Sequence, residues 1–259
     1  MQPLMQLPLW VQAAIATCFT WFMTALGASF VFLSKKFHPR LINAMQGTAA
    51  GIMIAASFFS LLLPAMERLE DRGPQISALV LAAGFLAGGA FIMVSDLAMS
   101  RLPSFAENGK RGGILTFAAM TLHNIPEGFA VGVAFGSLTG AYSEWVAAAM
   151  LAVGIGIQNF PEGLCVAVPL RRNGFSAGKA FFYGQFSGIV EIFAGVLGAA
   201  AVGFISSLLP WALAFSAGAM VAVSCAELIP SCVAEGKTSA VCGVTIGFAL
   251  MMLLDVLLG

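Results

Sequence analysis

The sequence predicts an all-α integral membrane protein with eight transmembrane helices, forming a single transmembrane domain over residues 1–259. Two features of its composition lead to this fold class. The chain of 259 residues is 59% hydrophobic and only 9% charged, whereas a soluble domain averages about 25% charged residues. It also holds 29 glycines, which are frequent in membrane helices because small residues let helix backbones pack closely.

The apolar runs give the positions of the helices. A helix needs about twenty apolar residues to cross the hydrocarbon core of a bilayer. Eight such runs follow one another, at residues 9–33, 45–66, 76–98, 113–137, 144–169, 179–206, 209–231 and 238–258. Charged residues, glycine or proline mark the break after each run in turn, at 35–40, 67–74, 101–113, 140–143, 171–174, Pro210 and 235–237. All breaks are short, so no soluble domain is inserted.

The basic residues predict the orientation of these helices. Ten of the twelve lysines and arginines fall in alternate breaks, and they are Lys35, Lys36, Arg40, Arg101, Lys110, Arg111, Arg171, Arg172, Lys179 and Lys237. Only Arg68 and Arg72 fall on the other side. The positive-inside rule places the first set in the cytoplasm, so both termini face outward. The formal net charge is zero, which argues against nucleic acid as a partner.

Two matching hexads lie inside the fourth and fifth predicted spans. The first runs from His123 to Gly128 with the sequence HNIPEG, and the second runs from Gln158 to Gly163 with the sequence QNFPEG. A short motif repeated in two spans is typical of related halves of a transporter. Chance would not repeat Asn-x-Pro-Glu-Gly at matched depth. The hexads therefore contain the candidate binding residues.

The spacing within each hexad suits a metal ion. His123 and Glu127 are four residues apart and share a helix face, as do Gln158 and Glu162. Each hexad proline lacks an N–H and frees the backbone carbonyl four residues earlier. Asn124 and Asn159 add amide groups. Carboxylate, imidazole and amide groups that face one another would suit zinc and its neighbours.

Glu191, in the sixth predicted span, is a third buried acid at similar depth. Three carboxylates cannot all remain ionised in lipid without cations between them. Two adjacent divalent ions bridged by Glu127, Glu162 and Glu191 would satisfy this condition, and so would one ion with a shared proton. The sequence leaves both arrangements open. It predicts the metal site between the fourth, fifth and sixth helices.

A second repeat supplies candidate pathway residues. The pattern Gly-x-Met-x-Ala-x-Ser occurs in the second and the seventh spans, and a proline follows each copy. The candidate residues for lining a route for the ion are Met53, Ser57, Ser60, Ser224 and Glu227. Ordinary packing is an equally good interpretation of the serines. Asp96, near the end of the third span, is interpreted as interfacial. Gly128, Gly132 and Gly136 predict close helix packing.

Three classes of function compete for this arrangement. A metal transporter uses all the buried groups. A channel that conducts protons or other cations through the same acids is the alternative, and saturation of uptake would separate the two. An intramembrane metalloprotease needs a second histidine paired with the first. The chain has only His38 and His123, and His38 lies in a basic break, so an enzyme is not expected. No resident cofactor is expected either.

The two hexads, His123-Asn-x-Pro-Glu-Gly and the later Asn159-x-Pro-Glu-Gly, resemble the ZIP family of Zrt/Irt-like metal transporters. The phrase GIGIQNFPEGL at residues 154–164 is most similar to the GufA-type bacterial branch of that family. The resemblance covers the whole chain. It implies import of zinc into the cytoplasm, with cadmium, iron or manganese also tolerated, across a bacterial inner membrane. It also implies commonly a homodimer. The position of the buried site near the middle of the spans separately predicts transport by alternating access.

The resemblance further implies a binuclear centre. One ion would be held by His123, Glu127, Gln158 and Glu162, and the second by Asn124, Glu127, Asn159, Glu162 and Glu191, with the glutamates as bridges. Many members of the family carry a histidine at the position of Gln158. Its absence replaces a strong nitrogen ligand with a weaker oxygen ligand, which predicts broader metal selectivity.

Overall fold

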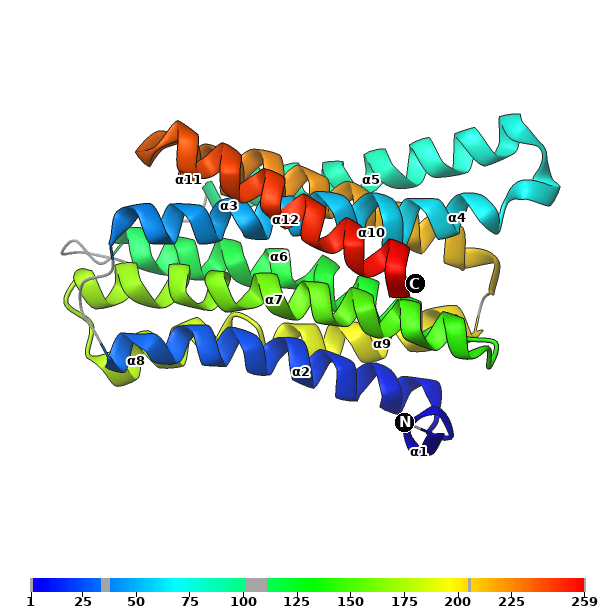
Figure 1. The fold of residues 1–259 in the computed structure, drawn as a ribbon, viewed down its shortest axis with the longest axis horizontal. Helices are drawn as coiled ribbons and strands as arrows, with labels where there is room; N and C mark the ends of the chain where they lie inside the picture. The colour runs from blue at the N-terminus through cyan, green and yellow to red at the C-terminus, as the bar shows by residue number, and fades with distance from the viewer. Residues whose placement is uncertain (1, 34–37, 101–110, 205, 259) are drawn as a thin grey trace.

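The computed structural model describes residues 2–33, 38–100, 111–204 and 206–258, which are almost entirely helical. The spans run parallel or antiparallel to one another along the length of the molecule (Figure 1). Their long helices are α2 (Leu9–Ser29), α3 (Pro39–Ala56), α5 (Pro74–Ser100), α6 (Arg111–Gly136), α7 (Tyr142–Arg172), α8 (Ala177–Phe186) with α9 (Val190–Phe204), α10 (Leu209–Val223) and α12 (Lys237–Leu258). The all-α fold class is confirmed.

Shorter elements extend or connect these helices. They are α1 (Gln2–Met5), η1 (Phe30–Phe32), η2 (Ser57–Leu62), α4 (Leu63–Glu67), η3 (Glu70–Arg72), η4 (Ser206–Leu208), η5 (Ser224–Leu228) and α11 (Ile229–Glu235). With these additions the helices match the eight predicted spans to within a few residues at most boundaries. The largest difference is at the second span, which begins at Pro39 rather than near residue 45, because proline at the first helical position is already preorganised for a helix.

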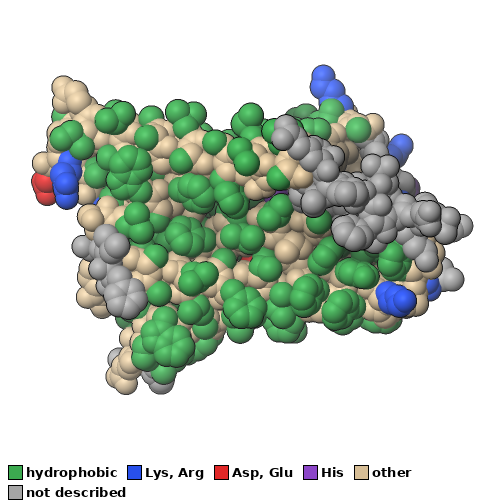
Figure 2. Space-filling model, turned by 180° about the vertical axis from the view of Figure 1, so that it is seen from behind, with side chains coloured by type: hydrophobic (Ala, Val, Ile, Leu, Met, Phe, Trp, Pro, Cys, Tyr) green, Lys and Arg blue, Asp and Glu red, His purple; other side chains and the backbone are tan. Residues whose placement is uncertain are grey.

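The surface is that of a multi-pass membrane protein. Seven helices are long and apolar enough to cross a bilayer, and α6, with 26 residues, is the eighth long helix. Figure 2 shows hydrophobic side chains spread over the length of one face, whereas the charged side chains on view lie at its two ends. Both termini lie towards the same end of the bundle (Figure 1). Lys35, Lys36, Arg101 and Lys110 lie outside the described residues.

The helices form two groups that meet at the centre of the molecule. The first group contains α2, α6, α7, α8 and α9, and the second contains α3, α5, α10 and α12. The most extensive pairs are α2 with α7, α6 with α9, α3 with α12 and α5 with α10, so each lies within a group. The groups touch mainly where α3 packs on α7 and α10 packs on α6. The hexads of α6 and α7 therefore lie in helices that border the second group.

Glycines bring α6 and α9 into close contact, as predicted for Gly128, Gly132 and Gly136. A Cβ atom added at Gly132 would lie 2.0 Å from the carbonyl oxygen of Gly195, and one at Gly128 would lie 2.4 Å from the Cα of Glu191. Neither position accepts a larger residue without moving a backbone. The Gly128 contact also fixes the distance between the first hexad and Glu191.

We expect Gly132→Ala to destabilise the protein, because its methyl group would push α9 away from α6. The expected cost is about 2 kcal/mol, as for other overpacked sites, which lowers the midpoint of thermal unfolding in detergent by several degrees. The matched control is Gly178→Ala in α8, where a Cβ atom meets nothing within 4 Å. Equal midpoints for the two variants would contradict this account of the α6–α9 contact.

The predicted repeat of the second and seventh spans has a structural counterpart. Ser57 donates a hydrogen bond to the carbonyl of Met53, and Ser224 donates one to the carbonyl of Met220. A π-helix begins at each serine, as η2 in one span and η5 in the other. A proline follows each π-helix within two residues, and its missing N–H and its ring favour such a local widening of the helix.

The sixth span is interrupted in its interior. Helix α8 ends at Phe186 and α9 begins at Val190, with a turn at residues 187–189. Non-helical backbone at membrane depth occurs where it lines a cavity or is buried in protein. Ser187 is buried, and Glu191 follows in the first turn of α9. The interruption therefore lies beside the predicted third acid, a feature that the sequence analysis did not predict.

Candidate metal centre

The predicted ligands lie in the buried centre of the first helix group. Four residues of the hexads, Asn124, Glu127, Gln158 and Asn159, are at most 1% exposed, and Glu191 of α9 is 0% exposed. His123 and Glu162 are almost as deeply buried. The carboxylate of Glu127 interacts electrostatically with those of Glu162 and Glu191, so the three acids predicted from separate spans share one buried region.

Many polar atoms of these residues have no hydrogen-bond partner. Buried polar groups are normally paired, because an unpaired one costs about 1–3 kcal/mol. The unpaired atoms are both ring nitrogens of His123, both carboxylate oxygens of Glu127, both amide atoms of Gln158, Oε2 of Glu162, and the Oδ1 atoms of Asn124 and Asn159. All except the Gln158 nitrogen are metal-ligand atom types, so the set has the composition of a cation site.

The two hexad asparagines are oriented by their amide nitrogens. Asn124 Nδ2 donates a hydrogen bond of 2.8 Å to the carbonyl of Ser187, in the turn between α8 and α9. Asn159 Nδ2 lies 2.9 Å from each carboxylate oxygen of Glu191 and 3.3 Å from the carbonyl of Thr20. In both residues the nitrogen is bound to protein, which leaves Oδ1 free to accept a cation.

The protein supplies no cationic side chain in these stretches of sequence. There is no lysine or arginine between Arg111 and Arg171, or between Lys179 and Lys237. These two intervals contain all seven predicted ligands as well as Glu227. A buried carboxylate without a partner is costly. The charge must therefore be balanced by protons or by a cation that enters from outside the chain.

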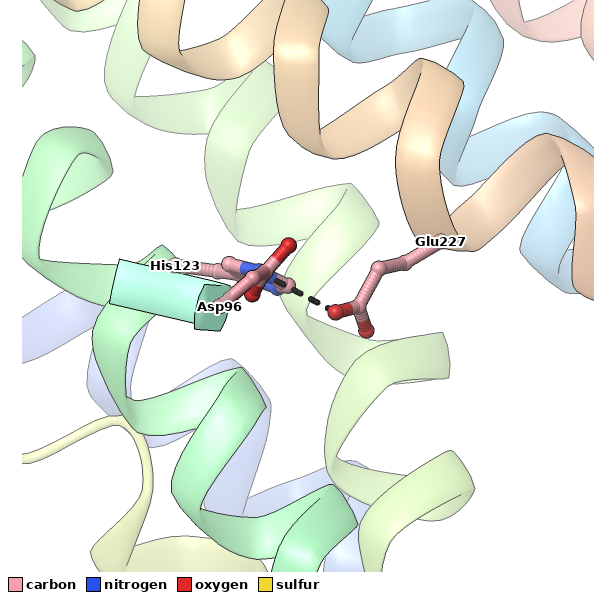
Figure 3. A group of neighbouring side chains, drawn as sticks. All are labelled: Asp96, His123 and Glu227. Atoms are coloured by element: carbon pink, nitrogen blue, oxygen red, sulfur yellow. Dashed lines mark ion pairs between the residues drawn. The ribbon is translucent and has the colours of Figure 1, made fainter. Parts of the chain in front are cut away.

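A second group of ligand atoms lies next to His123. Its Nε2 atom is 3.6 Å from Oε1 of Glu227, and Asp96 of α5 completes a set in which one ligand atom from each residue lies within 4.8 Å of the others. Figure 3 shows the three side chains converging from α5, α6 and η5. One histidine and two carboxylates are a common ligand set for divalent transition metals.

The interfacial interpretation of Asp96 missed this group. The side chain of Asp96 is partly buried and faces a histidine and an acid from two other helices. The available signal was weak: Asp96 is the only acid within the third predicted span, and an acid inside a span is a functional candidate by default.

The acids form a continuous series through the protein. Glu227 interacts electrostatically with both Asp96 and Glu162, and Glu162 and Glu191 both interact with Glu127. Because α6 starts at the end with the basic breaks, His123 lies one turn nearer that end than Glu127. The Asp96 group therefore lies between the hexads and the predicted cytoplasmic end.

The remaining candidate pathway residues lie in the second helix group. Met53 and Ser224 are fully buried, and the hydroxyl of Ser224 is 3.7 Å from the sulfur of Met53. Ser60 donates a hydrogen bond of 2.8 Å to Asp255 of α12, towards the end of the bundle that holds both termini. Ser57 is occupied by its bond to the backbone. The structure thus brings Glu227 to His123 of the first hexad, whereas the hydroxyl of Ser60 is bonded to Asp255 of α12.

A bundle of apolar helices around buried, unpaired candidate ligand atoms is the arrangement expected of a membrane protein that handles metal ions. Residues 106–255 match the family model of the ZIP zinc transporters. The human zinc transporter ZIP11 is 37% identical, with 96% of this chain and 97% of the relative aligned. The zinc transporter GufA of Myxococcus xanthus is 37% identical over 91% of this chain and 94% of the relative. The zinc transporter ZIPB of Bordetella bronchiseptica is 35% identical over 91% and 78%.

The chain therefore belongs to the ZIP zinc transporter family. The resemblance drawn from the hexads is confirmed, including its similarity to GufA. Membership of a transporter family also places the chain outside the enzymes, and it weighs against the channel alternative.

Proposed function

We propose that this protein carries zinc and related divalent cations, such as cadmium, iron and manganese, into the cytoplasm through the buried hexad site. The observation that carries the proposal is the set of unpaired, buried ligand atoms on α6 and α7. The names of its relatives, all zinc transporters, support zinc as the main substrate. In this proposal the metal ions are transported substrates, and the protein holds no resident cofactor.

The ion is held first by the hexad residues together with Glu191. In the proposed centre, His123, Glu127, Gln158 and Glu162 contact one ion, and Asn124, Asn159 and Glu191 join the two glutamates around a second. The free Oδ1 atoms of both asparagines support the second position. The position of His123, beside Glu227 and Asp96, suggests that His123 also passes the ion on towards the cytoplasmic end.

Alternating access is the proposed mechanism of this transfer. The hexad helices belong to one group of helices, and the candidate pathway residues Met53, Ser224 and Glu227 belong to the other. A displacement of one group relative to the other would expose the ion first to one side of the membrane and then to the other. After this displacement, oxygen ligands that exchange readily with water favour release of the ion.

The proposed setting is the bacterial inner membrane, with the basic breaks in the cytoplasm and both termini outside. The charge bias of ten basic residues against two supports this orientation. We also propose that residues 1–259 act as one transmembrane domain, and that two copies form a homodimer. Crosslinking in native membranes tests the homodimer.

The decisive experiment is uptake of radioactive zinc into proteoliposomes, with cadmium, iron and manganese as competitors, and with and without an imposed pH gradient. Uptake that saturates with zinc concentration supports a carrier, whereas a linear dependence would support the channel alternative. Absence of uptake by the purified protein, in every gradient tested, would contradict the proposal.

We expect Gln158→His to narrow the range of accepted metals towards zinc. Gln158 is fully buried, and its amide lies beside the Glu127 carboxylate. Imidazole would replace a weak amide oxygen with a nitrogen ligand that zinc prefers. The ratio of zinc to manganese transport should rise by about tenfold, the factor that corresponds to roughly 1.4 kcal/mol. The competitor series measures this ratio, and an unchanged profile would contradict a ligand role for Gln158.

A further inference from the structure

Thr20 of α2 contacts the proposed metal centre from a helix that carries none of its predicted ligands. Three threonines, Thr17, Thr20 and Thr24, follow one face of α2 and are at most 1% exposed. The hydroxyls of Thr17 and Thr24 bond to backbone carbonyls of their own helix. Threonine in a membrane helix commonly makes such bonds. Thr20 differs because its hydroxyl also forms a hydrogen bond with Oε2 of Glu191.

The backbone of Thr20 takes part in the same contact. Its carbonyl accepts the Asn159 amide nitrogen at 3.3 Å, and that nitrogen also lies 2.9 Å from both oxygens of Glu191. Thr20, Asn159 and Glu191 therefore form a closed triangle between α2, α7 and α9. Closed buried networks of this kind fix side-chain orientations more strongly than single hydrogen bonds do.

The triangle makes Glu191 different from the other acids of the centre. Both oxygens of Glu191 have partners, whereas neither oxygen of Glu127 has one and Oε2 of Glu162 has none. Glu191 is thus held in place by protein groups on both of its oxygens. At the same time the Asn159 nitrogen is fixed towards Glu191, which turns Asn159 Oδ1 away as a free acceptor.

We propose that Thr20 is a positioning residue of the metal centre. Its hydroxyl holds the Glu191 carboxylate, and through Glu191 it sets the Asn159 amide so that the oxygen faces the ion. Thr20 does not need to touch the ion. This inference rests on the proposed function of the hexad site, because it assigns Thr20 to the preorganisation of that site.

The other hexad is anchored without a threonine. Asn124 Nδ2 is bonded to the Ser187 carbonyl, which belongs to the turn that interrupts the sixth span. A side-chain substitution cannot remove that acceptor. The Asn159 side therefore depends on a hydroxyl and the Asn124 side depends on backbone alone, so substitution at position 20 should affect only one half of the centre.

The test compares Thr20→Val, Thr20→Ser and Thr17→Val. Valine keeps the shape of threonine and removes the hydroxyl, whereas serine keeps the hydroxyl. Thr17→Val is the matched control because Thr17 is equally buried on the same face and bonds only to its own helix. Two measurements are made on each variant: equilibrium zinc binding to the purified protein and the KM and maximal rate of zinc uptake.

Thr20→Val should raise both the dissociation constant and the KM for zinc by about tenfold, the loss expected for a hydrogen bond to a charged group. The maximal rate per folded protein should stay within about twofold, because chain length, packing volume and the ligands themselves are unchanged. Thr20→Ser and Thr17→Val should both bind zinc as the wild type does. A purely structural role would lower the amount of folded protein instead and would leave the KM unchanged.

A double-mutant cycle with Glu191→Gln completes the test. If Thr20 acts through Glu191, Thr20→Val should add little to the effect of Glu191→Gln on zinc binding. Full additivity would overturn the proposal, and so would equal zinc binding by Thr20→Val and Thr17→Val. Should Thr20→Val not fold, Thr20→Ala against Thr20→Ser gives the same comparison. Failure of the wild type to bind zinc at all would instead overturn the proposed function itself.

Discussion

Replacing Glu127 by alanine should abolish metal uptake while the protein still inserts and folds. Glu127 is fully buried, both of its oxygens lack partners, and the carboxylates of Glu162 and Glu191 lie within electrostatic reach. In the proposed centre this residue bridges both ions. Its loss removes a charged ligand from each position, so we expect zinc uptake to fall by at least about a hundredfold. Glu162→Ala should behave in the same way.

Loss of the Glu127 charge should not lower the thermal stability of the metal-free protein, although it abolishes uptake. An unpaired buried carboxylate destabilises the metal-free protein, so its conservative replacement, Glu127→Gln, should leave the unfolding midpoint without metal unchanged or slightly higher. Zinc should raise the midpoint of the wild type in proportion to the logarithm of its concentration once the site is saturated. That increase should be largely lost in Glu127→Gln. Thermal unfolding with and without zinc measures both effects.

The matched control for Glu127 is Glu70→Gln, because Glu70 is an exposed acid in the short connection before α5. It should transport zinc at the wild-type rate and keep the zinc-dependent increase in midpoint. Uptake by Glu127→Ala at the wild-type rate would contradict the role of Glu127 as a ligand in the proposed metal centre. Loss of inserted protein, rather than of uptake, would show that Glu127 serves packing alone.

The helices were predictable because their signal is local. Apolar length and the charged breaks depend on neighbouring residues only, so the spans agree with α2 to α12 to within a few residues at most boundaries. The hexads were predictable for a related reason: spacing of four residues places His123 and Glu127 on one helix face whatever the tertiary fold. Repetition of the motif then indicated that α6 and α7 share a site.

The parts of the site that were missed depend on how helices are placed against one another. Asp96 reaches His123 only because α5 and α10 lie beside α6 at a particular depth, which hydropathy does not encode. Thr20 is indistinguishable in sequence from Thr17 and Thr24, whose hydroxyls bond to their own helix. The interruption near Ser187 had a faint signal, since Ser187 and Gly188 are adjacent small residues in an otherwise apolar span.

The second large effect is expected at the Asp96 group. If an ion leaves the hexads through Asp96, His123 and Glu227, neutral variants of the two acids should slow its release without emptying the central site. Asp96→Asn and Glu227→Gln should each lower the maximal rate of zinc uptake by about tenfold or more, because a charged ligand is lost. Equilibrium zinc binding should remain near that of the wild type, since Glu127 and Glu162 are unchanged.

The two acids should also behave as a unit. Their ligand atoms lie within 4.8 Å of each other and of a His123 nitrogen, which is close enough for one ion to contact all three residues. The maximal rate of zinc uptake should therefore fall by a smaller factor in the double variant than the product of the factors for the two single variants. The reason is that the first substitution already disables the shared position. Asp71→Asn, at an exposed acid in the connection before α5, is the control and should transport normally.

Three results separate this route from simpler explanations. If the single variants lose central zinc binding as well as rate, Asp96 and Glu227 act on the hexad site and not on release. If the factors by which the single variants lower the maximal rate multiply in the double variant, the acids act independently and no common ion connects them. If the maximal rate is unchanged in both, the ion leaves by another path, and the contact between His123 and Glu227 serves the packing of α6 on the second helix group without taking part in transport.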